Sequence, residues 1–243
     1  MARARPARAV WSIVVAGGAG RRFGEMKQFS LLGGRPVLEW AVDACRAVSA
    51  GVVLVLPADA LGAPGSPGSD DTHGADVVVA GGPTRAESVR CGLAAVPALA
   101  EVIVVHDAAR PLASPDTFDA VLAALDDDVA GAIPGLAPSD TIKAVDHGGI
   151  VTGTLDRSTL VAVQTPQAFA AEVLRSAHRL GTAGGGSSGG VDGPPATDDA
   201  MLVEATGGRV RVVPGQPDNV KITTADDLEA AERLLAARRT RRA

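Results

Sequence analysis

The sequence contains no tyrosine, and aromatic residues make up only 2 % of its 243 residues. Proteins that bind single-stranded nucleic acid stack bases on aromatic side chains, so this composition disfavours such a partner. The formal net charge of −5 also provides no global positive field for a nucleic-acid backbone. We therefore expect no nucleic-acid partner.

Cysteines and long apolar runs are also scarce. The two cysteines, Cys45 and Cys91, lie in apolar, helix-patterned segments and indicate reduced core residues of a cytoplasmic protein rather than a disulfide. No segment approaches the roughly 18–20 apolar residues of a membrane span. The basic residues 1–9 predict a flexible tail and not an export signal, because cleavage after the short apolar run that follows would delete the first strand.

An almost uninterrupted apolar run over residues 10–16 predicts a buried strand. It leads into the glycine-rich residues 17–20 and then into the cations Arg21, Arg22 and Lys27. Glycines at a strand end let backbone N–H groups approach phosphates closely, and arginine and lysine neutralise the phosphate charge. We interpret this segment as the triphosphate loop of a nucleotide-using enzyme; an ordinary strand-to-helix turn is the alternative.

Two better-known phosphate loops do not match this segment. A dinucleotide-binding fingerprint requires G-x-G-x-x-G, but Phe23 occupies the position of the third glycine. A P-loop requires Gly-Lys followed by Ser or Thr, but Gly20 is followed by Arg21. These mismatches disfavour an NAD-dependent oxidoreductase and a P-loop enzyme.

Apolar runs of strand length alternate with helix-patterned segments over most of the chain. Further strands are expected at residues 52–56, 77–80, 102–105, 130–133, 162–165 and 210–213. Helices are expected at residues 36–48, 84–96 and 170–180, from Ser114, from Thr197 and after Thr224. This alternation predicts an α/β fold with a mostly parallel sheet and helices on both faces. Ligands of such sheets bind at the carboxyl ends of the strands, where the glycine loop and Asp107 both lie.

The alternation stops between about residues 136 and 162. Segments 140–145 and 150–154, joined by Asp146-His147-Gly148-Gly149, predict a β-hairpin arm. An isolated hairpin is marginally stable in water, so we expect the arm to pack on a second subunit. The whole chain, 1–243, is expected to form one domain that carries this arm and a flexible glycine- and serine-rich insert at 181–195.

Seven segments in order resemble the 2-C-methyl-D-erythritol 4-phosphate cytidylyltransferase family: AGGAGRRF…KQF, GGPTRAESV, VHDAARP, SDTIKAV, TLDRSTLVAVQTPQAF, TDDA and NVKITTADDL. VHDAARP and VQTPQAF are the most specific. The resemblance implies a Rossmann-like nucleotidyltransferase fold with a protruding β-hairpin dimerisation arm. It further implies a reaction in non-mevalonate isoprenoid biosynthesis. CTP and a polyol phosphate, 2-C-methyl-D-erythritol 4-phosphate, are joined to give 4-diphosphocytidyl-2-C-methyl-D-erythritol and pyrophosphate.

The resemblance also implies a role for individual residues. The catalytic cations are Arg22, Lys27 and Lys221. The CTP-binding residues are Ala16, Gly17, Gly18, Gly20, Gly82, Arg85, Ser88, Asp107 and Arg110. The residues that bind the polyol phosphate are Thr165 and Thr197, together with Thr141 and Arg157 from the arm of a homodimer partner. Asp107 is in addition the expected ligand of Mg²⁺ or another divalent metal.

Several alternatives stay open at this point. A pentitol-phosphate cytidylyltransferase, acting on ribitol 5-phosphate, shares the loop and much of the scaffold, and a non-catalytic nucleotide-binding protein would result if the loop misplaced Lys27. Ser88 is as consistent with a solvent-facing position as with base recognition, and Arg157 could pair with Asp156. His106 is expected to be structural, because an already anionic phosphate nucleophile needs no general base.

Overall fold

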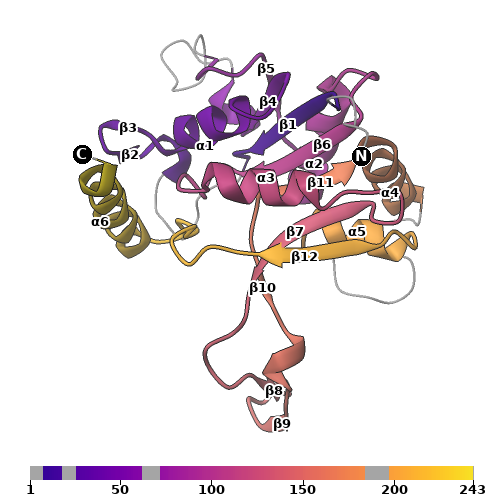
Figure 1. Ribbon diagram of the computed structural model, residues 1–243, viewed down its shortest axis with the longest axis vertical. Helices are drawn as coiled ribbons and strands as arrows, with labels where there is room; N and C mark the ends of the chain where they lie inside the picture. The colour runs from indigo at the N-terminus through magenta and orange to yellow at the C-terminus, as the bar shows by residue number, and fades with distance from the viewer. Residues whose placement is uncertain (1–7, 18–25, 62–71, 184–196, 243) are drawn as a thin grey trace, which may run out of the picture.

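The computed structural model describes residues 8–17, 26–61, 72–183 and 197–242. Its described part is built on an eight-stranded sheet with the strand order β10-β7-β11-β6-β1-β4-β5, in which β12 also pairs with β7 (Figure 1). The strands are β1 (Val10–Val15), β4 (Gly51–Leu56), β5 (Val77–Ala80), β6 (Val102–Asp107), β7 (Gly131–Leu136), β10 (Ala162–Val163), β11 (Gln167–Ala170) and β12 (Val210–Pro214).

The sheet is mostly parallel, as the alternation of strand and helix patterns predicts. Strand β1 pairs in parallel with β4 and β6, β4 pairs in parallel with β5, and β12 with β7, whereas β10 and β11 are antiparallel to their neighbours. Val15 lies opposite Asp107 in the register of β1 and β6. The start of the glycine loop and Asp107 therefore meet at one edge of the sheet.

Helices cover both faces of the sheet. On one face α1 (Val37–Arg46) and α3 (Pro115–Ala123) pack against strand residues such as Val14 and Leu54. On the other face α2 (Arg85–Ala95), α4 (Ala171–Ala183) and α5 (Asp199–Ala205) pack against the residues that alternate with them, such as Ile13. Strand β4 is buried at all of its positions, as expected for a central parallel strand covered on both faces.

A third apolar cluster holds the C-terminal helix α6 (Ala225–Arg242) against a small hairpin made of β2 (Leu31–Leu32) and β3 (Arg35–Pro36). Ile222 is fully buried in this cluster, so it anchors the segment that carries Lys221. The basic end of the chain continues α6, and Arg238 pairs with Asp218 at 2.7 Å.

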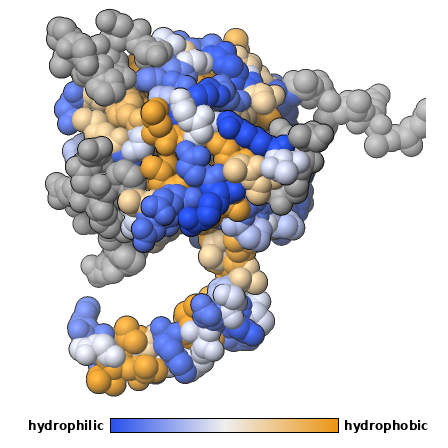
Figure 2. All heavy atoms as spheres, turned by 90° about the vertical axis from the view of Figure 1, so that its left-hand side faces the viewer, coloured by the Kyte–Doolittle hydropathy of each residue, from blue (hydrophilic) through white to orange (hydrophobic). Residues whose placement is uncertain are grey.

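The predicted hairpin forms and projects from the body of the molecule (Figure 1). Its strands β8 (Lys143–Val145) and β9 (Val151–Thr154) are antiparallel and shorter than expected. Figure 2 shows apolar side chains on the surface of this arm, and Val145, Ile150 and Val151 each expose more than half of their surface. The arm thus carries an apolar surface that its own chain leaves uncovered.

Further details differ from the sequence-based expectation. Strand β11 was not predicted, because a four-residue segment with buried Gln167 and Phe169 shows no clear alternation. Helix α4 runs to Ala183 rather than Leu180, and the rest of the expected insert lies outside the described residues. Pro36 precedes α1 as its N-cap and is not its first helical residue.

Another difference is at the N-terminus. The Ala9 carbonyl accepts hydrogen bonds from the backbone of Glu101 and Val102, so residue 9 is held beside the sheet rather than in a free tail; residues 1–7 lie outside the described part. Among the helices that the structure describes, none combines the length and apolarity that crossing a membrane requires.

Candidate active site

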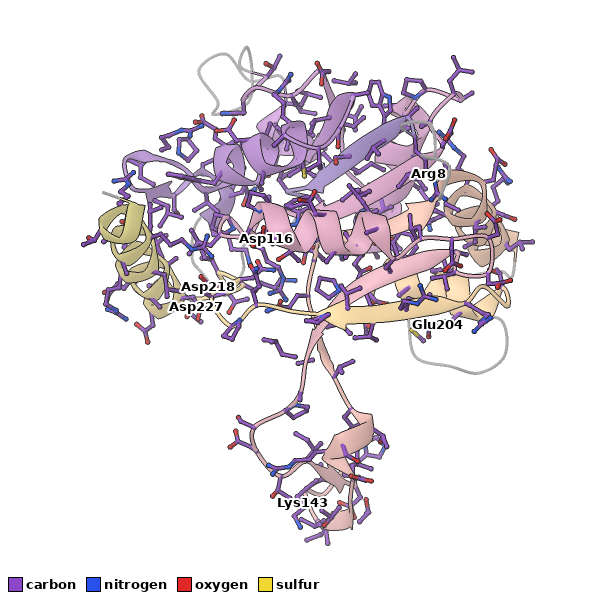
Figure 3. All side chains as sticks on the ribbon, in the orientation of Figure 1. Arg8, Asp116, Lys143, Glu204, Asp218 and Asp227 are labelled. Carbon is purple, nitrogen blue, oxygen red and sulfur yellow. The ribbon has the colours of Figure 1, made fainter. Side chains whose placement is uncertain are left out.

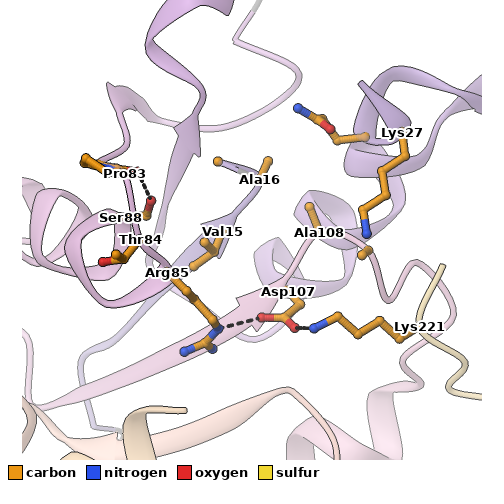
Figure 4. Close-up of a pocket in the computed structure, with 14 residues that line it drawn as sticks. Val15, Ala16, Lys27, Pro83, Thr84, Arg85, Ser88, Asp107, Ala108 and Lys221 are labelled. Carbon is orange, nitrogen blue, oxygen red and sulfur yellow. Dashed lines mark hydrogen bonds and ion pairs between the residues drawn. The ribbon is translucent and has the colours of Figure 1, made fainter. Parts of the chain in front are cut away.

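A cleft of about 470 Å³ opens at the carboxyl ends of β1 and β6 (Figure 4). The expected site residues that line it are Ala16, Gly17, Lys27, Gly82, Arg85, Ser88, Asp107 and Lys221. A second cavity of about 180 Å³ is lined by three further expected residues, Arg110, Thr165 and Thr197. Both cavities share Arg85, Asp107 and Lys221. We call these three side chains the charged wall.

Close backbone packing explains the glycines at the cleft. A Cβ atom at Gly17 would lie 2.9 Å from Ser88 Oγ, and one at Gly82 would lie 2.4 Å from Glu87 Cβ. The contact at Gly82 would displace the first turn of α2, whereas a Cβ at Gly17 would require the Ser88 side chain to move. Gly18, Gly20 and Arg22 lie outside the described residues, so their expected roles stay predictions.

The start of α2 forms one side of the cleft and is fixed by the predicted capping box. The Thr84 hydroxyl accepts a hydrogen bond from the Glu87 N–H, and the Glu87 carboxylate accepts one from the Thr84 N–H at 2.9 Å. Ser88 follows on this helix with 2 % of its surface exposed, and its hydroxyl donates to the Gly82 carbonyl. The solvent-facing alternative for Ser88 is therefore wrong.

Asp107 is the centre of the charged wall. Its Oδ1 accepts a hydrogen bond from Arg85 Nε at 3.2 Å, and its Oδ2 accepts one from Lys221 Nζ at 2.6 Å (Figure 4). Burial raises the pKa of Asp107, but the charges of Arg85 and Lys221 outweigh it and hold that pKa well below its usual value. An ionised carboxylate thus holds two cations between the two cavities.

Lys27 reaches the cleft from the side opposite the start of α2 (Figure 4). It begins the short 3-10 helix Lys27–Phe29, and its Nζ donates to the Ile222 carbonyl at 2.8 Å, directly after Lys221 in the chain. The chain has three lysines, of which these two line the cleft. The third, Lys143, lies on the arm (Figure 3). The two lysines expected to be catalytic are therefore brought together.

His106 is fully buried and both of its ring nitrogens are engaged inside the protein. Nε2 donates to the Arg110 carbonyl, and Nδ1 accepts from the Thr165 hydroxyl, which itself accepts from the Asp107 N–H. Burial lowers the pKa of His106 to about 4, so the imidazole is neutral near neutral pH. Its position matches the expected structural role, since it orients Thr165 and the end of β6.

Arg110 lines the second cavity and not the larger cleft, and its expected role in CTP binding stays a prediction. Its guanidinium donates to the carbonyls of Asn219 and Val163. Asn219, fully buried, donates in turn to the Thr165 carbonyl at 2.9 Å. These bonds join the segment before β11 to the segment that carries Lys221.

The expected arm residues do not reach either cavity of their own chain. Thr141 and Arg157 are exposed on the arm and are not among the residues that line the two cavities. The Arg157 guanidinium donates to the Ser139 carbonyl, and the Asp156 carboxylate accepts from Ser158 instead. The alternative of a local Arg157–Asp156 ion pair is thus not formed.

Comparison with known proteins agrees with this geometry. The sequence profile of the family described as IspD, 2-C-methyl-D-erythritol 4-phosphate cytidylyltransferase, matches residues 10–237.

The chain belongs to this cytidylyltransferase family.

Two relatives and one solved structure illustrate how far the match extends. The 2-C-methyl-D-erythritol 4-phosphate cytidylyltransferase of Nocardia farcinica is 41 % identical over 237 residues, which cover 94 % of this chain and 95 % of the relative. The crystal structure of 4-diphosphocytidyl-2C-methyl-D-erythritol synthase from Anaerococcus prevotii DSM 20548 is 28 % identical, with a TM-score of 0.78, and the match covers 95 % of this chain and all of that one. The resemblance found in the sequence is thus confirmed as family membership.

Some relatives of the cytidylyltransferase family are longer than this chain. The bifunctional enzyme IspD/IspF of Clavibacter michiganensis subsp. michiganensis is 42 % identical over 232 residues, which cover 92 % of this chain but 54 % of the relative. The chain thus spans about half the length of such bifunctional relatives and nearly all of the length of the Nocardia enzyme.

Sequence reasoning missed two groups of buried polar residues around the site. Gln164 and Asn219 tie the wall of the second cavity together, and Asp199 and His178 extend the charged wall into the core. Asn219 and Asp199 lie inside segments that carry the family resemblance, NVKITT and TDDA. Their place in these segments was the signal that the sequence offered, but it did not indicate which residues the two side chains would hydrogen-bond.

Proposed function

We propose that the protein transfers CMP from CTP to 2-C-methyl-D-erythritol 4-phosphate and releases pyrophosphate, as a step of non-mevalonate isoprenoid biosynthesis. The observation that carries the proposal is the charged wall: two cavities, of about 470 and 180 Å³, meet at Arg85, Asp107 and Lys221. The larger cleft would hold CTP, and the smaller cavity would hold the acceptor. Membership of the family and the match to the Nocardia enzyme support the choice of substrates.

The reaction makes one bond and breaks another at the α-phosphorus of CTP. A phosphate oxygen of the acceptor attacks this phosphorus, the bond to the β-phosphate oxygen breaks, and pyrophosphate leaves with the electron pair. The barrier comes mainly from bringing two anions together, so cations and positioning are what the protein must supply. At an effective dielectric constant of 20, two unit charges 4 Å apart interact by about 4 kcal/mol. Lys27 and Lys221 lie where they can contribute such interactions.

No residue of the described site is needed as a general base. An acceptor phosphate monoester has a second pKa of about 6, so its oxygens are already anionic at neutral pH. His106, the imidazole next to the site, is buried and neutral and is engaged at both ring nitrogens. This arrangement supports a mechanism that depends on charge and orientation alone.

A divalent metal, expected to be Mg²⁺, belongs to the proposal through Asp107. Among the described residues there is no cluster of three or more His, Cys, Asp or Glu side chains that could hold a metal ion alone. Mg²⁺ bound to a nucleotide usually takes one or two protein carboxylates and completes its ligands with phosphate oxygens and water. The single carboxylate of Asp107 fits that pattern. The metal would supply further positive charge to the phosphates.

The proposal includes a homodimer in which each arm completes the partner's site. Thr141 and Arg157 are the arm residues expected to contact the polyol phosphate, and neither lines a cavity of its own chain. The exposed apolar residues of the arm are the kind of surface that a partner subunit covers. The free thiols of Cys45 and Cys91 support the expected cytoplasmic location.

Pyrophosphate release tests the reaction. Purified protein is given CTP and Mg²⁺ with 2-C-methyl-D-erythritol 4-phosphate, with ribitol 5-phosphate, or with no acceptor. We expect release with the first acceptor only. Release with ribitol 5-phosphate alone would make the protein a pentitol-phosphate cytidylyltransferase. CTP binding without release in any reaction would make it a non-catalytic nucleotide-binding protein.

Subunit mixing tests the shared site. The variants Lys27→Met and Arg157→Ala are each inactive on this account, but a mixed dimer contains one site that carries neither substitution. Random reassembly of equal amounts should therefore restore about one quarter of the wild-type activity, because half of the dimers are mixed and each has one intact site. A mixture no more active than its two components would contradict the shared site.

A further inference from the structure

The charged wall continues into the core through Asp199. Nη1 of Arg85 donates a hydrogen bond to Asp199 Oδ2 at 2.7 Å, and Asp199 Oδ1 lies 3.0 Å from His178 Nε2. Asp199 and His178 are 1 % and 2 % exposed, and they come from α5 and α4 on the α2-bearing face of the sheet. A hydrogen-bonded path thus runs from Lys221 and Asp107 through Arg85 into the interior.

Asp199 carries a charge at this buried position. Burial raises the pKa of Asp199, but the Arg85 charge and the hydrogen bond from His178 outweigh it and hold that pKa below its usual value. His178 Nε2 therefore donates to an ionised carboxylate, while its Nδ1 has no hydrogen-bond partner among the described residues. A buried ion pair of this kind adds little net stability compared with apolar packing, and fixing a unique geometry is its better-attested role.

The geometry that Asp199 fixes is the single contact between Arg85 and Asp107. A guanidinium and a carboxylate prefer two parallel hydrogen bonds when both are free to turn. Here Asp199 holds Nη1 of Arg85 and so fixes the orientation of the guanidinium, and in that orientation Nε contacts only Asp107 Oδ1. The other oxygen of Asp107 is left to Lys221.

We propose that Asp199, oriented by His178, is a positioning residue that divides Asp107 between Arg85 and Lys221 and so places Lys221 at the wall between the two cavities. Without the charge of Asp199, Arg85 turns to contact both oxygens of Asp107 and displaces Lys221. The inference rests on the proposed cytidylyl transfer for its effect on rate, but its effect on structure is independent of any substrate.

Asp199→Asn is the first variant, because it removes the charge and keeps the shape. We expect kcat to fall about 10- to 100-fold, since misplacing a catalytic group by about 1 Å costs on the order of 10² in rate. The KM for CTP should also rise, because Arg85 and Lys221, which the substitution would move, both line the larger cleft. Asp126→Asn, which breaks the exposed Asp126–Arg211 pair elsewhere, is the matched control and should leave both constants unchanged. An unchanged kcat in Asp199→Asn overturns the proposal.

A second pair of variants separates positioning from a merely structural role. If Asp199 acts only through Arg85, adding Asp199→Asn to Arg85→Met causes no further loss of kcat. In Arg85→Met, Asp199 is left as a buried charge without its cation, which destabilises the protein. The double variant removes that charge, so it should unfold at no lower temperature than Arg85→Met. If Asp199→Asn lowers kcat by the same factor in both backgrounds, Asp199 does not act through Arg85 and the proposal is wrong.

A crystal structure of Asp199→Asn decides the matter without a substrate. We expect two contacts between Arg85 and Asp107 and a Lys221 Nζ that has left Asp107 Oδ2. A Lys221–Asp107 contact retained as in the wild-type chain overturns the proposal. If the wild-type protein released no pyrophosphate with any acceptor, the proposed function would fail, whereas this structure would still test the positioning role of Asp199.

Discussion

Replacing Lys221 by methionine should separate catalysis from stability. The substitution removes the ammonium group and keeps most of the apolar stem. A cation about 4 Å from a phosphate contributes about 4 kcal/mol at an effective dielectric constant of 20, and losses of one charge-stabilising donor in other enzymes cost roughly 10²–10³ in kcat. We therefore expect kcat to fall about 100- to 1,000-fold.

The cost in stability should be small by comparison. The Lys221 side chain is 42 % exposed, and Asp107 keeps its contact with Arg85 when Lys221 is gone. Exposed ion pairs contribute about 0–1 kcal/mol, and the free energy of unfolding should fall by about 1 kcal/mol, the upper end of that range, because the Asp107 side chain is only 11 % exposed.

The assay is pyrophosphate release at saturating CTP and acceptor, together with urea unfolding of each variant. Arg211→Met is the control, because the Arg211 side chain is 47 % exposed and pairs with Asp126 at 3.1 Å, away from both cavities. It should lose a similar amount of stability and no activity. A Lys221→Met enzyme that keeps more than a tenth of the wild-type kcat would refute the role given to this cation.

Three further outcomes are expected. Thr84→Ala removes the N-cap of α2 and should lower the free energy of unfolding in urea by about 1 kcal/mol; an unchanged midpoint would contradict the capping box. Gly82→Ala places a methyl group against Glu87 and should lower stability by about 1–3 kcal/mol while raising the KM for CTP; wild-type kinetics would show that α2 can move freely. His106 has a folded pKa of about 4 against roughly 6.5 when unfolded. Between these values only the unfolded state binds the proton, so stability should fall by about 3 kcal/mol from pH 7 to pH 4. His106→Gln should lose that part of the pH dependence.

The central sheet could be predicted because its strands carry strong local signals. Strand β4 is apolar throughout, and β1 ends in glycines that mark its carboxyl edge. Strand β11 gave no such signal, because it is four residues long and includes Gln167, whose amide reaches Asp198 on another segment. Its antiparallel place beside β6 follows from tertiary packing rather than from its own pattern.

The candidate site could be predicted as a set of residues but not as an arrangement. The resemblance placed Lys27, Arg85, Asp107 and Lys221 in one site, and all four line the same cleft. It did not give the contacts among them, because Arg85 meets Asp107 across 22 residues of sequence and Asp107 meets Lys221 across 114. Arg110 shows the same limit, since its placement beside the second cavity depends on carbonyl groups that no side-chain motif identifies.

In the proposed reaction, cations from separate segments converge on the α-phosphate of CTP at the wall between the two cavities. A crystal structure with CTP, Mg²⁺ and 2-C-methyl-D-erythritol 4-phosphate bound tests it most directly. The account predicts the cytidine beside Gly82 and Ser88, the acceptor phosphate in the smaller cavity, and the α-phosphate within reach of Lys27 and Lys221. A triphosphate bound with its α-phosphate away from both lysines would contradict it.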